Sequence, residues 1–309
     1  MKIIFMGTPD FAISSLESLY ENGHSIDLVI TQKDRPKGRG KKVQYTPVKE
    51  KALELGLEVF QPDSINDTES INKIKDINPD FIVVVAYGQI LKKQILQVPK
   101  YGCYNVHASL LPKYRGAAPI NWSIINGDKE TGVTIMEMAE GLDSGDMIIW
   151  DSIPINSDDD AITIHDKLST LGGELIVKAL NDIKNGVANK IPQDHNISTY
   201  ASMLDKNLGR INWNDSGENI INLIRGLKPW PSAYTQYKDD IIKVHKATLI
   251  DKLKEGSNGQ IVKVDKDGIY VNSKDKTIIL EEVQFPGKKK LKVEEYLRGN
   301  SIEEDIILK

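Results

Sequence analysis

An asparagine and a histidine two residues apart are the side chains in this sequence best suited to chemistry. Asn105 and His107 open the stretch NVHASLLP, residues 105–112, at the end of a short apolar run. If residues 103–106 form a strand, the two side chains project from the same face of its end. An amide offers a donor and an acceptor, and an imidazole gives or takes a proton near neutral pH. The pair is therefore a candidate for acid–base chemistry, with a turn-capping asparagine and a structural histidine as the alternative.

A glycine-bracketed acidic loop is the second candidate. Asp143 lies within EGLDSGD, residues 140–146, directly before another apolar segment. A carboxylate beside an imidazole orients the ring and stabilises its charged form. Aspartate beside glycine is also common in plain turns, so an ordinary turn residue is the alternative. The loop lacks the length and the ligand order of an EF-hand.

Two other kinds of site are disfavoured. Residues 7–10, GTPD, follow the first apolar run without the G-x-G-x-x-G pattern, and Pro9 lacks an amide that a phosphate cradle would use. The single cysteine, Cys103, excludes an intrachain disulfide and a cysteine-rich metal centre. None of the five histidines forms an H-x-x-x-H pair, so we expect no metal.

The elements that must position these residues alternate in type. Apolar runs typical of buried strands and periodic segments typical of helices follow one another over the first 184 residues. The expected strands are 2–6, 26–30, 59–60, 81–86, 103–106, 133–138 and 146–155, and the expected helices are 11–20, 48–55, 71–77 and 161–183. This alternation predicts an α/β domain with a Rossmann-like, mostly parallel sheet, in which sites lie at the carboxyl ends of the strands.

The pattern changes after residue 184. Residues 185–206 contain glycine, proline and asparagine with weak periodicity, and we interpret them as a linker. An amphipathic helix at 216–227 and five short strands between 233 and 283 follow, which predicts a small antiparallel β-barrel, with the oligonucleotide-binding (OB) type as one candidate. We therefore expect a catalytic domain at 1–184 and a barrel domain at 207–309.

Composition and charge narrow the class of protein. The chain has 309 residues, 40% of them hydrophobic, and a net charge of −4, so a nucleic-acid coat over the whole surface is disfavoured. No run of about 18 apolar residues occurs and the first residues lack a signal-peptide core, so we expect a cytoplasmic protein without membrane association. Residues 33–42, KDRPKGRGKK, hold six bases and one acid, which could dock a polyanion or form a solvated face.

The joint pattern of motifs resembles the folate-dependent formyltransferases. The resemblance covers nearly the whole chain and departs at Ala108, where many members have glycine. Besides NVHASLLP, it rests on GTPDF at 7–11, QKDRPKGRGKK at 32–42, VVVAYGQIL at 83–91, YRGAAP at 114–119, ETGVTIM at 130–136, GLDSGD at 141–146 and LKPWPSAY at 227–234.

The resemblance implies a reaction and roles for the candidate residues. It implies transfer of a formyl group from 10-formyltetrahydrofolate, as co-substrate, to the amino group of methionyl initiator tRNA. Asn105 and protonated His107 would donate to the developing oxyanion, and Asp143 would keep His107 charged and help relay a proton. The folate site would be lined by Tyr87, Gly88, Ile90, Leu91, Ser109, Leu110, Leu111 and Pro112.

The resemblance also implies contacts with tRNA from two basic segments. The candidate residues are Arg39, Lys41, Lys42, Lys288, Lys289 and Lys290. Arg39 lies between two glycines and could enter a groove of RNA, whereas a solubilising turn is the alternative for residues 287–290. We expect a monomer. Two other functions stay open: a sugar-nucleotide N-formyltransferase with the same donor, and a non-catalytic RNA-binding module, against which the intact candidate residues argue.

Overall fold

The computed structural model describes residues 1–37 and 42–309, without the side chains of residues 37 and 42. Arg39, Lys41 and the side chain of Lys42 therefore lie outside the described residues. The described chain divides into two compact units, which are described separately below. The first unit comprises Met1–Pro119, Thr131–Pro154 and His165–Ala201, and the second comprises Ile120–Glu130, Ile155–Ile164 and Ser202–Lys309.

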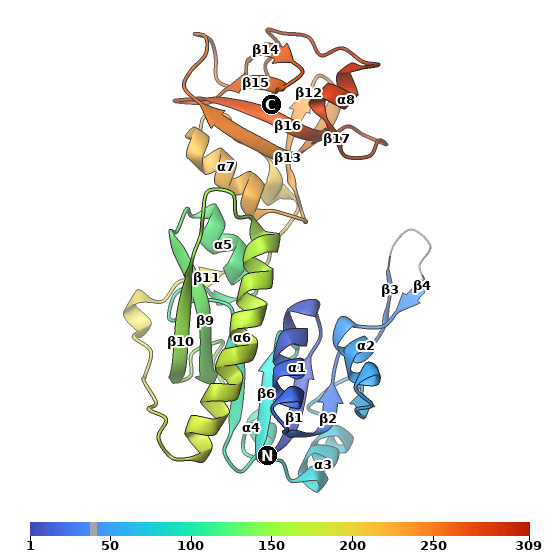
Figure 1. Cartoon of the computed structure of the whole chain (residues 1–309), viewed down its shortest axis with the longest axis vertical. Coiled ribbons are helices and arrows are strands. Elements are labelled where there is room, and N and C mark those ends of the chain that lie inside the picture. The colour runs from blue at the N-terminus through green and yellow to red at the C-terminus, as the bar shows by residue number, and fades with distance from the viewer. Residues whose placement is uncertain (38–41) are drawn as a thin grey trace. The chain divides into compact units, whose positions relative to one another are not determined.

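A mostly parallel sheet lies at the centre of the first unit (Figure 1). In the described residues its strand order is β10-β9-β7-β6-β1-β2-β5. The strands from β7 to β5 pair parallel with one another, whereas β9 pairs antiparallel with β7. The strands are β1 (Lys2–Gly7), β2 (Ser25–Ile30), β5 (Val59–Phe60), β6 (Phe81–Val85), β7 (Cys103–His107), β9 (Glu130–Glu137) and β10 (Met147–Pro154). The predicted Rossmann-like, mostly parallel sheet is confirmed.

Continuous apolar sequence explains the central strands. Every residue of FIVVV in β6 is buried, as are five of the six residues of β1, because helices cover both faces of a parallel sheet. The helices of this unit are η1 (Asp10–Ala12), α1 (Ile13–Glu21), α2 (Pro47–Glu54), α3 (Thr68–Ile77), α4 (Lys93–Leu96) and most of α6 (Ala161–Lys184). Helices α2 and α3 begin at side-chain caps, in which Thr46 and Asp67 accept from the amides of Lys49 and Ser70.

Two small pairs of strands complete the first unit. The basic segment forms a hairpin of β3 (Arg35–Lys37) and β4 (Lys42–Gln44). Beyond α6, η2 (His195–Ile197) leads into β11 (Tyr200–Ala201), which pairs parallel with β8 (Arg115–Gly116). Residues 191–201, part of the expected linker, therefore make specific contacts in this unit.

An antiparallel sheet dominates the second unit. Its order is β12-β13-β16-β15-β14 in the described residues, with β17 beside β16. Residues 305–309 hydrogen-bond to both edges, through Leu308 to Gly259 before β14 and through Lys309 to Gln236 in β12, and so close the sheet. The elements are α5 (Pro119–Ile125), η3 (Asn207–Gly209), α7 (Gly217–Gly226), β12 (Ala233–Tyr237), β13 (Asp240–Ile250), β14 (Ile261–Asp265), β15 (Gly268–Asn272), β16 (Thr277–Gln284), β17 (Leu291–Lys292) and α8 (Val293–Leu297).

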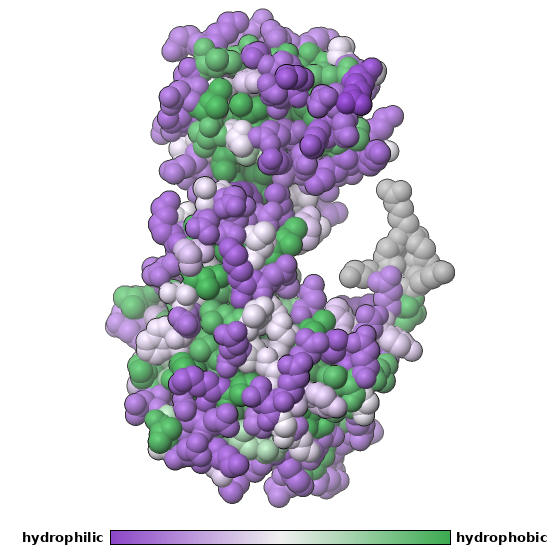
Figure 2. Space-filling view, in the orientation of Figure 1, coloured by the Kyte–Doolittle hydropathy of each residue, from purple (hydrophilic) through white to green (hydrophobic). Residues whose placement is uncertain are grey.

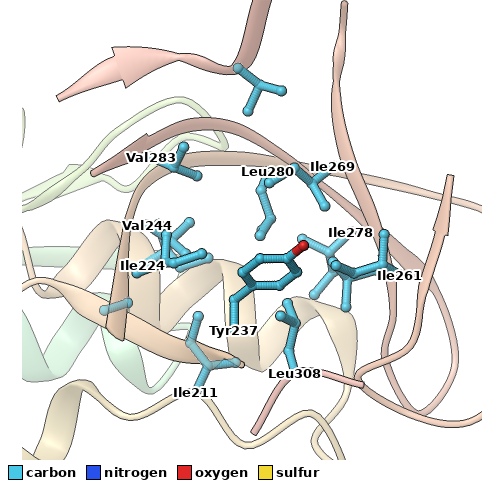
Figure 3. Close-up of a cluster of buried hydrophobic side chains, with 14 of the residues drawn as sticks. Ile211, Ile224, Tyr237, Val244, Ile261, Ile269, Ile278, Leu280, Val283 and Leu308 are labelled. Atoms are coloured by element: carbon cyan, nitrogen blue, oxygen red, sulfur yellow. The ribbon is translucent and has the colours of Figure 1, made fainter. Parts of the chain in front are cut away.

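The closed sheet surrounds an apolar core of its own. The ring of Tyr237 lies among Ile278, Leu280 and Leu308, which come from strands and from the C-terminal residues (Figure 3). Alternating burial along β12 matches a sheet with one covered face. The predicted antiparallel second domain is thus confirmed.

The face of the molecule drawn in Figure 2 is mainly polar. Figure 2 shows hydrophilic side chains over most of the face drawn, with apolar residues scattered between them. None of the described helices has the length and apolar character needed to cross a bilayer.

Candidate functional site

Strand β7 brings Asn105 and His107 to the carboxyl end of the sheet. It lies between β6 and β9, and its alternation places both side chains on one face. His107 is buried and Asn105 is half-buried. The expectation that the two lie together at a strand end therefore agrees with the structure.

Asp143 joins this pair from the loop between β9 and β10. Its Oδ1 accepts a hydrogen bond from Nδ2 of Asn105 over 3.4 Å, and its Oδ2 lies 3.7 Å from Nδ1 of His107. The side chain of Asp143 is only 15% exposed, so water screens this contact weakly. The three residues picked from the sequence thus form one cluster.

Tyr114 holds the other side of the histidine ring. Nε2 of His107 lies 2.9 Å from the carbonyl oxygen of Tyr114. Both ring nitrogens therefore face oxygen acceptors, an arrangement in which the imidazolium can donate from each nitrogen. The Tyr114 carbonyl therefore occupies Nε2, and an oxyanion that took a hydrogen bond from the same nitrogen would compete with it.

Backbone geometry fixes the loop that carries Asp143. Asp143 has a φ of +46°, a left-handed conformation that aspartate tolerates better than most residues. A Cβ at Gly145 would overlap the carbonyl oxygen of Glu137, so only glycine fits there. Gly145 of the acidic loop therefore has a structural reason that the sequence alone did not supply.

Four residues of the site were missed or left without a role by sequence reasoning. The amide of Gly116 donates to Oδ2 of Asp143, and the side chain of Gln193 donates to the backbone of the same loop. Tyr114, Arg115 and Gly116 lie in the motif YRGAAP, which contributed to the family resemblance but assigned no role to any of the three. Gln193 lies in the weakly patterned segment 185–206, where nothing in the sequence marked it.

The expected folate residues come from two adjacent loops. Residues 86–91 follow β6 and residues 109–112 follow β7, and these strands are parallel neighbours, so both loops lie at the same edge of the sheet. Tyr87, Leu91, Ser109 and Leu111 are buried, Leu110 and Pro112 are half-buried, and Gly88 and Ile90 are exposed, Ile90 by 77%. The exposed members and the backbone are the groups available to a ligand.

Several of these residues are held in place by burial and by hydrogen bonds within the protein. Burial raises the pKa of Tyr87 to about 12, so its hydroxyl stays protonated. The Ser109 hydroxyl donates to the carbonyl of Lys113 over 2.6 Å. The Thr134 hydroxyl donates to Ser109 and accepts from the amide of Leu111, which ties β9 to the loop after β7. The SLLP loop is therefore firmly anchored.

The second group of predicted tRNA contacts lies on a turn of the second unit. Lys288, Lys289 and Lys290 are exposed between β16 and β17. Nζ of Lys290 lies 2.8 Å from Oε2 of Glu282. The turn therefore presents cationic side chains to solvent.

The single cysteine, Cys103, is buried in β7. Burial, with a smaller contribution from Glu137, raises the pKa of its thiol far above the usual range. A thiol of this kind is inert as a nucleophile.

Comparison with known proteins identifies relatives along the whole chain. The family model "Formyl transferase" matches residues 1–180, and "Formyl transferase, C-terminal domain" matches residues 203–301. The chain is 53% identical over 310 residues to a methionyl-tRNA formyltransferase of Clostridium acetobutylicum, and 50% identical over 308 residues to that of Clostridioides difficile, with all of both chains covered in each case.

Solved structures share the fold at low identity. An N-formyltransferase from Helicobacter canadensis, in complex with folinic acid and dTDP-3-aminofucose, matches with a TM-score of 0.68 at 23% identity, over 91% of this chain and 98% of the other. HypX from Aquifex aeolicus, in complex with tetrahydrofolic acid, matches with a TM-score of 0.65 at 15% identity, over 96% of this chain and 47% of HypX.

Proposed function

The chain belongs to the formyl transferase family and, within it, to the methionyl-tRNA formyltransferases, and we propose from this premise how its residues carry out the reaction. The enzyme transfers the formyl group of 10-formyltetrahydrofolate to the free amino group of methionyl-tRNA. The acceptor that we propose is the initiator tRNA, and the product then serves translation initiation. We further propose that the enzyme acts as a monomer in the cytoplasm.

The observation that carries the proposed mechanism is the cluster of Asn105, His107 and Asp143. The lone pair of the amine attacks the formyl carbon, a C–N bond forms, and the carbonyl electron pair moves onto oxygen. Nδ2 of Asn105 is the donor for this oxygen, and removal of one such donor from an enzyme typically costs about 3–4 kcal/mol. The positive ring of His107 adds a second electrostatic contribution.

The intermediate then collapses with a proton transfer. The oxygen electron pair re-forms the carbonyl bond, and the bond between the formyl carbon and N10 of the folate breaks. The former amine loses a proton and N10 gains one, so charge balances over the step. His107 lies between Asp143 and the Tyr114 carbonyl, and we assign it the transfer of this proton while Asp143 compensates its charge.

The loops after β6 and β7 are the proposed folate site. Their exposed and half-buried members Gly88, Ile90, Leu110 and Pro112 would contact the pterin and its linker. The buried members Tyr87, Leu91, Ser109 and Leu111 would shape the loops from beneath. This division rests on the exposure of the side chains and on the anchoring of the SLLP loop by Thr134.

Two basic regions are the proposed tRNA contacts. The exposed lysines 288–290 would neutralise phosphates, and the hairpin of β3 and β4 carries the segment in which Arg39, Lys41 and Lys42 were selected from the sequence. The base of this hairpin is fixed by an ion pair between Lys49 and Asp34, with Gln61 bonded to both side chains.

Incubation with purified substrates tests the reaction directly. Methionyl initiator tRNA and 10-formyltetrahydrofolate should yield N-formylmethionine on the tRNA, detected by mass spectrometry of the aminoacyl group. Amino-sugar nucleotides are the competing acceptors, because the N-formyltransferase from Helicobacter canadensis, which shares the fold, is in complex with dTDP-3-aminofucose. Formylation of the sugar nucleotide without formylation of the tRNA would refute the proposed acceptor.

A further inference from the structure

Gln193 links a buried arginine to the loop that carries Asp143. Its Oε1 accepts from Nε and from a terminal nitrogen of Arg115, over 3.0 and 2.6 Å. Its Nε2 donates to the backbone carbonyls of Asp143 and Gly145, over 2.9 and 2.8 Å. Gln193 is 5% exposed and Arg115 is 3% exposed, so these bonds are shielded from water.

Chemistry fixes the orientation of this amide. A guanidinium has donors and no acceptor, so only the oxygen of Gln193 can face Arg115. The NH2 group is then directed at two carbonyl oxygens, which can only accept. The same terminal nitrogen of Arg115 that bonds Gln193 also lies 3.1 Å from Nδ1 of His195, which gives the guanidinium a second partner. The glutamine therefore has a single hydrogen-bonding solution.

The two carbonyls that Gln193 holds belong to Asp143 and Gly145, which flank Ser144 in the acidic loop. Asp143 has a φ of +46°, a conformation of raised energy that persists only where surrounding contacts impose it. The position of its carboxylate beside Asn105 and His107 depends on this backbone. One NH2 group bonded to both carbonyls is thus a direct restraint on the position of the carboxylate.

We infer that Gln193 is a positioning residue for Asp143, held in turn by Arg115. The inference rests on the proposed role of Asp143 in the formyl transfer. Gln193 has no contact with Asn105 or His107 among its hydrogen bonds, so it acts on the reaction through the loop. A displacement of about 1 Å in a catalytic group can cost on the order of 10²-fold in rate.

Two substitutions separate the bonds of the glutamine. Q193M keeps the approximate length and removes all its hydrogen bonds, whereas Q193E keeps an oxygen for Arg115 and places a second oxygen against the two loop carbonyls. We expect both variants to lower kcat about 10- to 100-fold, with KM for methionyl-tRNA and for the folate donor changed less than about threefold. If pairing with Arg115 were all that mattered, Q193E would retain wild-type kcat.

A double-mutant cycle with D143N identifies the path of the effect. If Gln193 acts through the carboxylate, Q193M should lower kcat less than about threefold in the D143N background, because the group it positions is already lost. Q260M is the matched control. Gln260 also bridges a loop, accepting from Ser257 and donating to Asp305, and its effect should be below about twofold and the same in both backgrounds.

The outcomes are distinct. Equal loss from Q193M in the wild-type and D143N backgrounds, or wild-type kcat in both Gln193 variants, would overturn the positioning role while leaving the proposed function in place. Wild-type enzyme that leaves methionyl-tRNA unformylated would instead refute the proposed function. Hydrogen–deuterium exchange of residues 141–146 needs no activity, and it should rise in Q193M and Q193E but not in Q260M. Unchanged exchange in both Gln193 variants would also overturn the inference.

Discussion

The backbone amide of Gly116 donates a 2.8 Å hydrogen bond to Oδ2 of Asp143, the oxygen that faces Nδ1 of His107. A backbone donor has no rotamers, so it fixes the carboxylate at low entropic cost. The YRGAAP turn therefore orients the acid of the site, and the same turn supplies the Tyr114 carbonyl that holds the imidazole. One short segment thus sets the geometry of two of the three proposed catalytic residues.

Replacement of His107 by alanine should abolish most turnover while folate binding persists. The change removes the group to which we assign the proton transfer and a proposed donor to the oxyanion, so kcat should fall at least about 10²-fold. Steady-state kinetics and calorimetric titration with tetrahydrofolate measure the two properties. H165A is the matched control, since His165 packs against Phe11 and should cost less than about twofold. Near-normal turnover in folded H107A would exclude the proposed role.

Replacement of Gly116 by alanine should damage both stability and rate. Gly116 has a φ of +112°, and a Cβ there would lie 2.8 Å from the carbonyl oxygen of Ala201 in the paired strand β11. Strain of this kind typically costs about 1–3 kcal/mol. Urea unfolding should show this loss, and kcat should fall because the amide that holds Asp143 moves.

Gly186 provides the control for Gly116. It also has a positive φ, +71°, but nothing lies within 4 Å of an added Cβ. G186A should therefore cost only the backbone term, about 1 kcal/mol, and leave kcat unchanged. Equal kinetic effects of both substitutions would show that the packing of Gly116 on β11 does not reach the site.

Sequence patterns predicted the large elements because those elements repeat a simple physical rule. The apolar run of β6 and the long periodic segment of α6 each extend over enough residues for burial to be visible in the pattern. Asn105 and His107 could be placed on one face because strand alternation is regular. The cluster with Asp143 needed the motif resemblance, since no local rule relates residues 38 positions apart.

The rest of the site could not be predicted because it depends on long-range contacts of irregular backbone. The pairing of β8 with β11 joins Arg115 to Tyr200 through short segments with no periodicity. Gln193 lies in a stretch whose glycine and proline content predicts a linker, yet its amide is buried against Arg115. Composition indicates how flexible a segment can be, but the contacts of that segment depend on the tertiary structure.

Acidification should destabilise the protein through His245 on β13. Burial lowers the pKa of His245, a hydrogen bond with Gln284 opposes this, and the charges of Lys290 and Lys243 lower it further. The folded-state pKa lies below the ordinary value of 6.5, so the folded state binds fewer protons than the unfolded state as pH falls through that value. The free energy of unfolding therefore decreases on acidification. H245Q removes the titrating group. In thermal unfolding of the full chain, the Tm of H245Q relative to that of the wild type should rise as the pH is lowered from 8 to 5.5. A Tm difference that stays constant over this pH range would contradict the prediction.

The lysine turn between β16 and β17 should act on tRNA affinity and leave the chemical step intact. Its three exposed lysines would each release counterions from a phosphate, at a slope of about 0.7–0.9 per contact in log Kd against log salt. K288A/K289A/K290A should therefore weaken binding of methionyl-tRNA and flatten this slope by about one to two units, with kcat at saturating tRNA unchanged. Lys290 already pairs with Glu282, so it should contribute less than a free cation.

The control K252A/K254A/K266A removes the same charge from other exposed positions of the second unit and should leave the slope unchanged. Filter-binding titrations over a range of salt concentrations decide between the two, because equal slopes for both triple variants would mean that net charge, rather than this turn, attracts the tRNA.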